Sequence, residues 1–233
     1  MPYMEKNICV TDRMEKNICV TDRMGKFICV TNRSLVRGDF LSRLGEILEN
    51  GSGALPAPDA VILREKDLTE EEYRLLAEKV REICCRAGVP LILNTFTGAA
   101  RALGIRSIQL PVRKLDALSD KEKADFNRIG ASVHTPEEAG RAADLGASYV
   151  TAGHIFATDC KKGLPPRGMD FLKACCARSS VPVYAIGGIG PDNFQACLDA
   201  GASGVCIMSG YMRTEGEGPA LPSGRFSSPR TAR

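Results

Sequence analysis

The sequence predicts an α/β fold in which eight parallel strands and their helices close into a single (β/α)8 barrel, the TIM-barrel architecture. Three observations support this fold class. The chain has 233 residues, of which 44% are hydrophobic, and barrels of this length form one domain. Short apolar, β-branched segments alternate with helical ones, as in the βα units of a parallel sheet. The alternative, an open doubly wound sheet, usually carries a GxGxxG turn after its first strand, and the sequence has no such turn there.

The first predicted strand belongs to the third copy of an internal repeat. Met4–Arg13 and Met14–Arg23 both read MEKNICVTDR, whereas Met24–Arg33 reads MGKFICVTNR. Only the third copy leads directly into a helical segment, so we assign the first strand to Phe27–Thr31 and the first helix to Leu35–Glu49. Residues 1–23 are predicted to be a duplicated, strand-like extension, loosely held and without a function of its own.

The other elements follow in alternation. The helix Glu70–Ala87 opens at the capping residue Thr69, and the helix after the fifth strand opens at Thr135, with Pro136 in its first turn, and ends at Gly146. The remaining strands are predicted at Ala60–Arg64, Pro90–Asn94, Ser107–Leu110, Arg128–Val133, Ser148–Ala152, Val181–Ile186 and Gly204–Met208. The remaining helices are predicted at Gly98–Leu103, Asp120–Asn127, Met169–Ala177 and Pro191–Ala200, and a loop is predicted at Phe156–Arg167.

The barrel domain is predicted to cover residues 24–212. Residues 213–233 are rich in Gly, Pro, Ser and Arg without apolar periodicity, and we expect a mostly disordered tail. The eighth helix is therefore expected to be missing or degraded. One side of the barrel would then be free for a partner subunit, which makes a homo-oligomer one option, or for the N-terminal extension.

Composition narrows the function classes. The 31 basic and 28 acidic residues give a net charge of only +3, which does not indicate a nucleic-acid partner. No apolar run is long enough to span a membrane, and the N-terminus lacks the apolar core of a secretory signal. The ten cysteines form no CxxC pair, so we expect reduced thiols in a cytoplasmic protein. Neither they nor His134 and His154 have the spacing of metal ligands, and no metal is expected.

Candidate site residues lie at the carboxyl ends of the strands, where barrels place their active sites. Gly187 and Gly188 end the seventh strand, and Ser209 follows the eighth. Glycines there let backbone N–H groups approach an anion, and this position of a barrel often binds phosphate. A tight turn that needs glycine conformations is the alternative interpretation.

Two further groups could carry chemistry. His134 follows the fifth strand, and an imidazole is suited to proton transfer near neutral pH, although a lone histidine can also serve only as a structural hydrogen bonder. Arg64 and Lys66 follow the second strand and could bind a carboxylate or a phosphate. Alternatively, Glu65 and Asp67 neutralise them in a solvated turn. The other polar residues predicted at strand ends are Thr31, Asn32, Asn94, Gln109, His154 and Gly210.

Five segments together resemble the motifs of the thiamine phosphate synthase superfamily. In chain order they are ILREKDLTEEEY, GASVHTPEEA, GHIFATDCKKG, YAIGGIGPDN and GVCIMSG, and the resemblance covers about residues 24–212. It implies a (β/α)8 barrel that binds a thiazole phosphate at its mouth. The phosphate would be held at Gly187, Gly188, Met208 and Ser209.

Several positions depart from the pattern of a synthase. That pattern implies Gln where Ile62 stands and Asn-Asp where this chain has Asn94-Thr95. After the fourth strand it implies HLGQ-D, where this chain reads Gln109-Leu110-Pro111-Val112-Arg113. Where the synthase pattern has a PTxTK-like loop that binds pyrophosphate, this chain reads Ala157-Thr158-Asp159-Cys160-Lys161. The aspartates that would hold magnesium are missing, which disfavours pyrophosphate transfer.

The chain is especially similar to the thiazole tautomerase branch of the superfamily, through SVHTPEEA and through GHIFATDCKKGL with its following PRG. The resemblance implies an isomerase of thiamine biosynthesis whose catalytic residue is His134. The implied substrate is a carboxythiazole phosphate kept dearomatised by an exocyclic double bond. Moving a proton from the ring carbon that bears the carboxylate to the exocyclic carbon makes the ring aromatic, and no cofactor is needed.

The same resemblance suggests roles for the other residues. Arg64 and Lys66 would contact the carboxylate, and Thr158 and Lys161 would line a lid loop. His154 would order its own loop or serve as an alternative base. Two rival functions stay open: a residual thiamine phosphate synthase, which is a transferase, and a non-enzymatic module that binds a thiazole or thiamine phosphate and regulates a partner.

Overall fold

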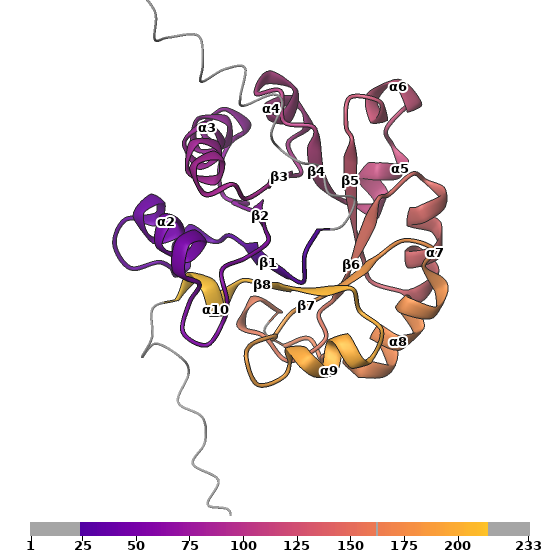
Figure 1. Ribbon diagram of the computed structural model, residues 1–233. Helices are drawn as coiled ribbons and strands as arrows, with labels where there is room; N and C mark the ends of the chain where they lie inside the picture. Colours follow the sequence, from indigo (N-terminus) through magenta and orange to yellow (C-terminus); the bar gives the residue numbers. More distant parts are fainter. Residues whose placement is uncertain (1–23, 162, 214–233) are drawn as a thin grey trace, which may run out of the picture.

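The structure, a computed structural model, describes residues 24–161 and 163–213, which form a closed barrel of eight parallel strands (Figure 1). Each strand pairs in parallel with the next along the chain, and the last pairs with the first. The predicted fold class is therefore confirmed. The strands are β1 Phe27–Val30, β2 Ala60–Leu63, β3 Leu91–Asn94, β4 Ser107–Pro111, β5 Arg128–Val133, β6 Tyr149–Gly153, β7 Val183–Ile186 and β8 Gly204–Ile207.

Helices surround the barrel in Figure 1. They are α2 Phe40–Asn50, α3 Glu70–Ala87, α4 Thr97–Ala102, α5 Val112–Asp116, α6 Asp120–Lys123, α7 Pro136–Asp144, α8 Gly168–Arg178, α9 Phe194–Asp199 and α10 Ser209–Met212, with 3-10 helices η1 Arg33–Leu35 and η2 Asp159–Lys161. In the described part of the chain, only the four-residue α10 follows β8. The predicted N-terminal extension, residues 1–23, and the predicted tail beyond Arg213 lie outside the described residues.

The core has two layers because side chains alternate between the two faces of each strand. Residues such as Val61 face outward and belong to the same buried hydrophobic cluster as Leu44 of α2. The other layer fills the barrel itself. Its buried members are Met24, Ile28, Val30, Ala60, Ile62, Ile92, Tyr149, Tyr184 and Cys206. A strand such as β2 is buried on both faces, which explains its continuous apolar sequence AVIL.

The predicted helix starts at Thr69 and Thr135 are confirmed. The Thr69 hydroxyl accepts from the backbone N–H of Glu72, whose carboxylate accepts from the Thr69 N–H, which completes a capping box. The Thr135 hydroxyl accepts from the N–H of Glu138, and Pro136 is the first helical residue. These interactions satisfy N–H groups that a helix leaves without partners at its first turn.

Three predicted helices begin or end differently. The first begins at Phe40 rather than Leu35. Gly38 has a φ of +90°, which interrupts the helix, and Asp39 is the N-cap, whose carboxylate accepts from the backbone N–H of Ser42. The helix predicted at Asp120–Asn127 ends at Lys123, because the chain turns to bury Phe126, and α5 precedes it. The one predicted from Pro191 begins at Phe194. No helix among the described residues is long and apolar enough to cross a membrane.

Candidate active site

The predicted catalytic residue His134 immediately follows β5 at the carboxyl end of the barrel. Its side chain is exposed, and its Nδ1 lies 3.2 Å from the carbonyl oxygen of Gly153, the last residue of β6. Because a carbonyl oxygen only accepts hydrogen bonds, this contact places the ring proton on Nδ1. In the neutral tautomer with its proton on Nδ1, Nε2 carries the lone pair. The backbone N–H of His134 donates to the carboxylate of Glu138 in α7, which fixes the chain where the ring emerges.

The turn after β7 requires glycine at both predicted positions. Gly187 has a φ of +103° and Gly188 one of +66°, conformations that other residues rarely adopt. A Cβ on Gly187 would lie 2.4 Å from the Cβ of His154, and one on Gly188 would lie 2.3 Å from the oxygen of Ala157. The turn therefore packs directly against the segment that follows β6, and the Phe156 N–H donates to the Gly187 oxygen at 3.0 Å.

Backbone donors gather at the ends of β7 and β8, which are neighbours in the barrel. Among residues 24–161 and 163–213, no group accepts a hydrogen bond from the N–H of Gly187, Gly188 or Ser209. Met208 is half-buried just before Ser209. The arrangement has the donors, the position and the close backbone approach of a phosphate site in a barrel.

Three predicted cations are brought together at the other side of the mouth. Arg64 follows β2 and is half-buried, and burial lowers the pKa of its guanidinium. The charge of Arg64 lowers the pKa of the Lys66 ammonium, and burial and the charge of Lys161 lower it further. The end of β2 and the η2 segment after β6 thus converge. Like charges held together in this way favour a bound anion.

The alternative interpretation is that Glu65 and Asp67 neutralise these cations; in the structure both carboxylates instead form their ion pairs with Arg33. Glu65 is buried and accepts hydrogen bonds from the Thr31 hydroxyl at 2.7 Å and from the backbone and guanidinium of Arg33. The Asp67 carboxylate pairs with the same guanidinium at 2.6 Å. Neighbouring side chains of an extended segment point to opposite sides, so Glu65 turns away from Arg64. No described carboxylate lies within ion-pair distance of Arg64 or Lys66.

Two residues predicted at the mouth lie deeper. Thr31 is fully buried. Its hydroxyl donates to the carboxylate of Glu65 and accepts from the backbone N–H of Arg64. Gln109 is the middle residue of β4 and is buried inside the barrel. Its amide Nε2 donates to the Ser132 hydroxyl at 2.9 Å and to the Thr151 hydroxyl at 3.1 Å. Both residues support the mouth from below.

Three further predicted residues lie on the segment between β6 and α8, whereas Asn32 precedes η1, Asn94 ends β3 and Gly210 lies in α10. Lys161 is exposed in η2, and its N–H donates to the Thr158 oxygen at 3.1 Å, while the Thr158 hydroxyl accepts from the Cys160 N–H. His154 is buried, and its Nε2 lies 3.4 Å from the oxygen of Leu164. His154 thus contacts its own loop, whereas Thr158 and Lys161 are accessible.

Sequence reasoning did not find three supporting residues. Arg33 forms ion pairs with Glu65 and Asp67. The Tyr73 hydroxyl donates to the Leu63 oxygen at 2.6 Å and accepts from the Asn94 N–H at 2.8 Å. Arg213 donates to the Asp159 carboxylate at 3.0 Å and so joins the end of α10 to η2. The charged pairs carry no local sequence signal, because their members are distant along the chain.

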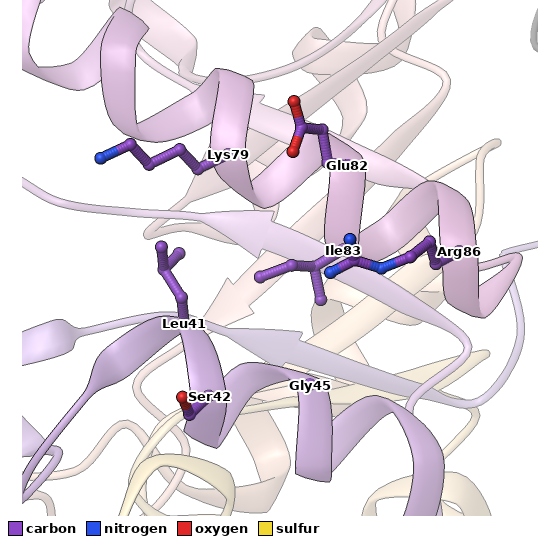
Figure 2. A pocket seen from close by; sticks show the side chains of 7 residues that line it. All are labelled: Leu41, Ser42, Gly45, Lys79, Glu82, Ile83 and Arg86. Atoms are coloured by element: carbon purple, nitrogen blue, oxygen red, sulfur yellow. The ribbon is translucent and has the colours of Figure 1, made fainter.

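A separate pocket lies outside the barrel, between α2 and α3 (Figure 2). None of the predicted site residues lines it. Its lining residues are Leu41, Ser42, Gly45, Lys79, Glu82, Ile83 and Arg86. The described residues contain no group of three or more His, Cys, Asp or Glu side chains that could hold a metal ion.

The family model and the curated relatives point to the same family. The family described as TMP-TENI, thiamine monophosphate synthase, matches residues 27–211. A thiamine-phosphate synthase from Desulfitobacterium hafniense strain Y51 is 35% identical over 183 residues, which are 76% of this chain and 84% of that protein. One from Alkaliphilus oremlandii is 31% identical over 78% of this chain and 86% of that protein. The solved thiamine phosphate pyrophosphorylase from Pyrococcus furiosus superposes with a TM-score of 0.70 at 26% identity, over 83% of this chain and 90% of that one.

Proposed function

This chain belongs to the thiamine monophosphate synthase family and is an enzyme of thiamine biosynthesis, and from that premise we propose that it acts as a thiazole tautomerase. The proposed substrate is the dearomatised 2-carboxy-4-methylthiazol-5(2H)-ylidene ethyl phosphate, and the product is the aromatic carboxythiazole phosphate. The observation that carries this proposal is the contact between His134 Nδ1 and the Gly153 oxygen, because it leaves Nε2 as a proton acceptor at the barrel mouth.

The proton transfer needs one base. Nε2 of His134 removes the proton from the ring carbon that bears the carboxylate, and the electron pair left behind delocalises into the exocyclic double bond. The imidazolium formed keeps its Nδ1–H on the Gly153 oxygen, which holds the ring in place while it carries charge. Nε2 then returns the proton to the exocyclic carbon. Aromatisation makes the reaction favourable, so the enzyme has mainly to position the substrate and move the proton.

The two anionic ends of the substrate correspond to the two donor groups of the mouth. The phosphate would bind the N–H groups of Gly187, Gly188 and Ser209. The carboxylate would bind Arg64 and Lys66, with Thr158 and Lys161 nearby on the segment after β6. Cations beside the carboxylate also stabilise the negative charge that develops when the neighbouring carbon loses its proton.

Substrate conversion measured by ultraviolet absorbance or NMR tests the proposal. We expect aromatisation by the purified protein with a metal chelator present, and a loss of about 10²- to 10⁴-fold in rate for His134→Gln, the usual range for one acid–base residue. The matched control is Glu82→Gln on the outer face of α3, which should keep full activity. Full turnover by His134→Gln would exclude His134 as the base.

The second candidate is thiamine-phosphate synthase, and the names of the relatives favour it. Against it, Thr95 after β3 and Arg113 in α5 stand at the two positions where the synthase pattern has aspartates. The test is formation of thiamine phosphate with release of pyrophosphate in the presence of magnesium. Such turnover, without aromatisation of the carboxythiazole phosphate, would replace the tautomerase by the synthase. Saturable binding without either conversion would indicate a regulator.

A further inference from the structure

The outer face of α3 changes the sign of its charge along the helix. Its first turn carries Glu70, Glu71 and Glu72, whereas Lys79 and Arg86 are exposed in its second half. In the part of the chain that the structure describes, no carboxylate lies within ion-pair distance of Lys79 or Arg86. A helix that is acidic in one half and basic in the other is complementary to an antiparallel copy of itself.

An apolar side chain stands in the middle of this face. Leu75 is 47% exposed, and Leu164 is the only other large hydrophobic side chain that is exposed among residues 24–161 and 163–213. Glu71 and Glu78 lie about one helical turn before and after Leu75, on the same side of α3. Covering the leucine with apolar surface would be favourable, because it removes that surface from water.

The pocket between α2 and α3 has the shape that accepts such a side chain. Its volume is about 360 Å³, and α3 contributes Lys79, Glu82, Ile83 and Arg86 to its lining. These four residues have the spacing i, i+3, i+4 and i+7, which forms a hole for a side chain of a facing helix. Leu41 from α2 and Ile83 from α3 extend into the pocket and make its interior apolar (Figure 2).

The pocket stays open because α2 has a glycine at position 45. A glycine inside a helix lowers stability relative to alanine. Two common reasons for a glycine do not apply at this position. Gly45 is not among the glycines with a positive φ, and no atom lies within 4 Å of the place where its Cβ would be. The missing side chain instead leaves the space between α2 and α3 unfilled.

We propose that this face of α2 and α3 is a homodimer interface, in which Leu75 of a second copy inserts into the pocket. The two α3 helices run antiparallel about a two-fold axis near Lys79, so each copy supplies one inserted leucine and one hole. Glu71, four residues before the inserted Leu75, then lies beside Arg86 of the other copy. The same contact is repeated on the other side of the axis.

The charges along α3 are compatible with this register. Glu71 pairs with Arg74 of its own helix at 2.7 Å, but its carboxylate is 67% exposed and can accept from a second guanidinium. Near the axis, Lys79 of both copies lies beside Glu78 and Glu82, so no uncompensated positive charge collects there. The inference is independent of the proposed catalytic activity, because the interface lies on the outside of the barrel.

Sedimentation of the full chain over a concentration series tests the proposal, and we expect a dimer. Leu75→Ser removes the inserted side chain and Gly45→Leu fills the hole, so both variants should be monomers. Gly45→Leu should unfold at the same or a higher temperature than the parent protein, because leucine favours the helix and no atom blocks its Cβ. Its loss of the dimer could then not be attributed to unfolding.

Charge reversal tests the antiparallel register. Arg86→Glu and Glu71→Arg each bring like charges together twice per dimer, and each should raise the Kd at least about tenfold. Combining them restores opposite charges and should recover most of the affinity. Lys173→Glu on the exposed side of α8 is the matched control and should leave the Kd unchanged. A monomer at every concentration, a dimer that survives Gly45→Leu, or a double variant that binds no tighter than the single variants would each overturn the proposal.

Discussion

The Thr31 hydroxyl donates a 2.7 Å hydrogen bond to Glu65 and so joins the carboxyl ends of β1 and β2. Glu65 is buried and also accepts from Arg33. Glu65→Gln should lower the free energy of unfolding by about 2 kcal/mol. The amide NH₂ of glutamine would replace a carboxylate oxygen and would face the N–H and O–H groups that now donate to it. Asp67→Asn removes the negative charge that pairs with Arg33 at the exposed end of this network. It should lower the free energy of unfolding by roughly 0.5 kcal/mol or less. Urea unfolding distinguishes the two, and equal effects would contradict the central role of Glu65.

Gly188 should not tolerate a side chain. Its Cβ would meet the Ala157 oxygen at 2.3 Å, and its φ of +66° disfavours alanine. We expect Gly188→Ala to raise the KM for the phosphorylated substrate at least about tenfold, as expected for a displaced charged hydrogen bond. Gly190→Ala is the matched control, because no atom lies within 4 Å of its Cβ position. Equal KM values for both variants would argue against phosphate binding at this turn.

Thr95 is strained at the end of β3. Its φ is +74°, which is a rare value for a β-branched residue and costs about 1–3 kcal/mol. Asparagine tolerates this conformation, so Thr95→Asn should raise the free energy of unfolding by about 1 kcal/mol. Thr95→Val keeps the branching and should give no gain. A melting temperature that rises equally in both variants would show that the hydroxyl, rather than the backbone, is the cause.

The Asp159–Arg213 pair joins η2 to the end of α10. Arg213 is also held through its backbone oxygen by Arg43 of α2. A partly exposed pair contributes about 0.2–1 kcal/mol, so Arg213→Ala should speed tryptic cleavage after Lys161 by roughly 1.4- to 5-fold. Arg178→Ala breaks a comparable pair with Glu137 on the outer helices and should not change cleavage at this site. No acceleration in Arg213→Ala would mean that the pair does not hold η2.

Stability at low pH should depend on Glu72. Hydrogen bonds from the backbone and the hydroxyl of Thr69 lower the pKa of its carboxyl below 4.5. A carboxyl whose pKa is lower in the folded state stabilises that state at pH values above its pKa in the unfolded chain. This contribution is lost as the pH falls through the pKa of the folded state. Glu72→Gln should therefore flatten the dependence of melting temperature on pH below about 4.5. Glu82→Gln on the same helix should leave the curve parallel to that of the parent protein.

The strands could be predicted because a parallel barrel buries both faces of each strand. The continuous apolar run of Ala60–Leu63 carries that signal on its own. Helix starts were predictable where a capping residue is unambiguous, as at Thr69. The start of α2 was not, because Leu35 and Val36 extend the apolar pattern across Gly38, whose φ of +90° breaks the helix.

Some residues of the candidate site could likewise be predicted from the sequence, and others could not. Sequence position alone placed His134, Gly187 and Gly188 at strand ends, and the structure has them there. The role of Glu65 could not be predicted, because its partner Arg33 lies on another strand end and the adjacent Arg64 is the more obvious partner. The depth of Gln109 depends on Gly130, which lies opposite it in β5 and leaves room for the amide.

Closure of the barrel through β1 and β8 has a consequence for synthesis of the protein. During translation the chain emerges from its N-terminal side, and β8 is the last described strand to appear. Until Ile207 has left the ribosome, β1 and β7 each carry a row of unpaired backbone groups, and such rows can pair with other nascent chains. The pairing of β1 with β8 removes both rows at once. The period of greatest aggregation risk therefore ends with the last strand, which makes release of the C-terminal part the step at which a chaperone would matter most.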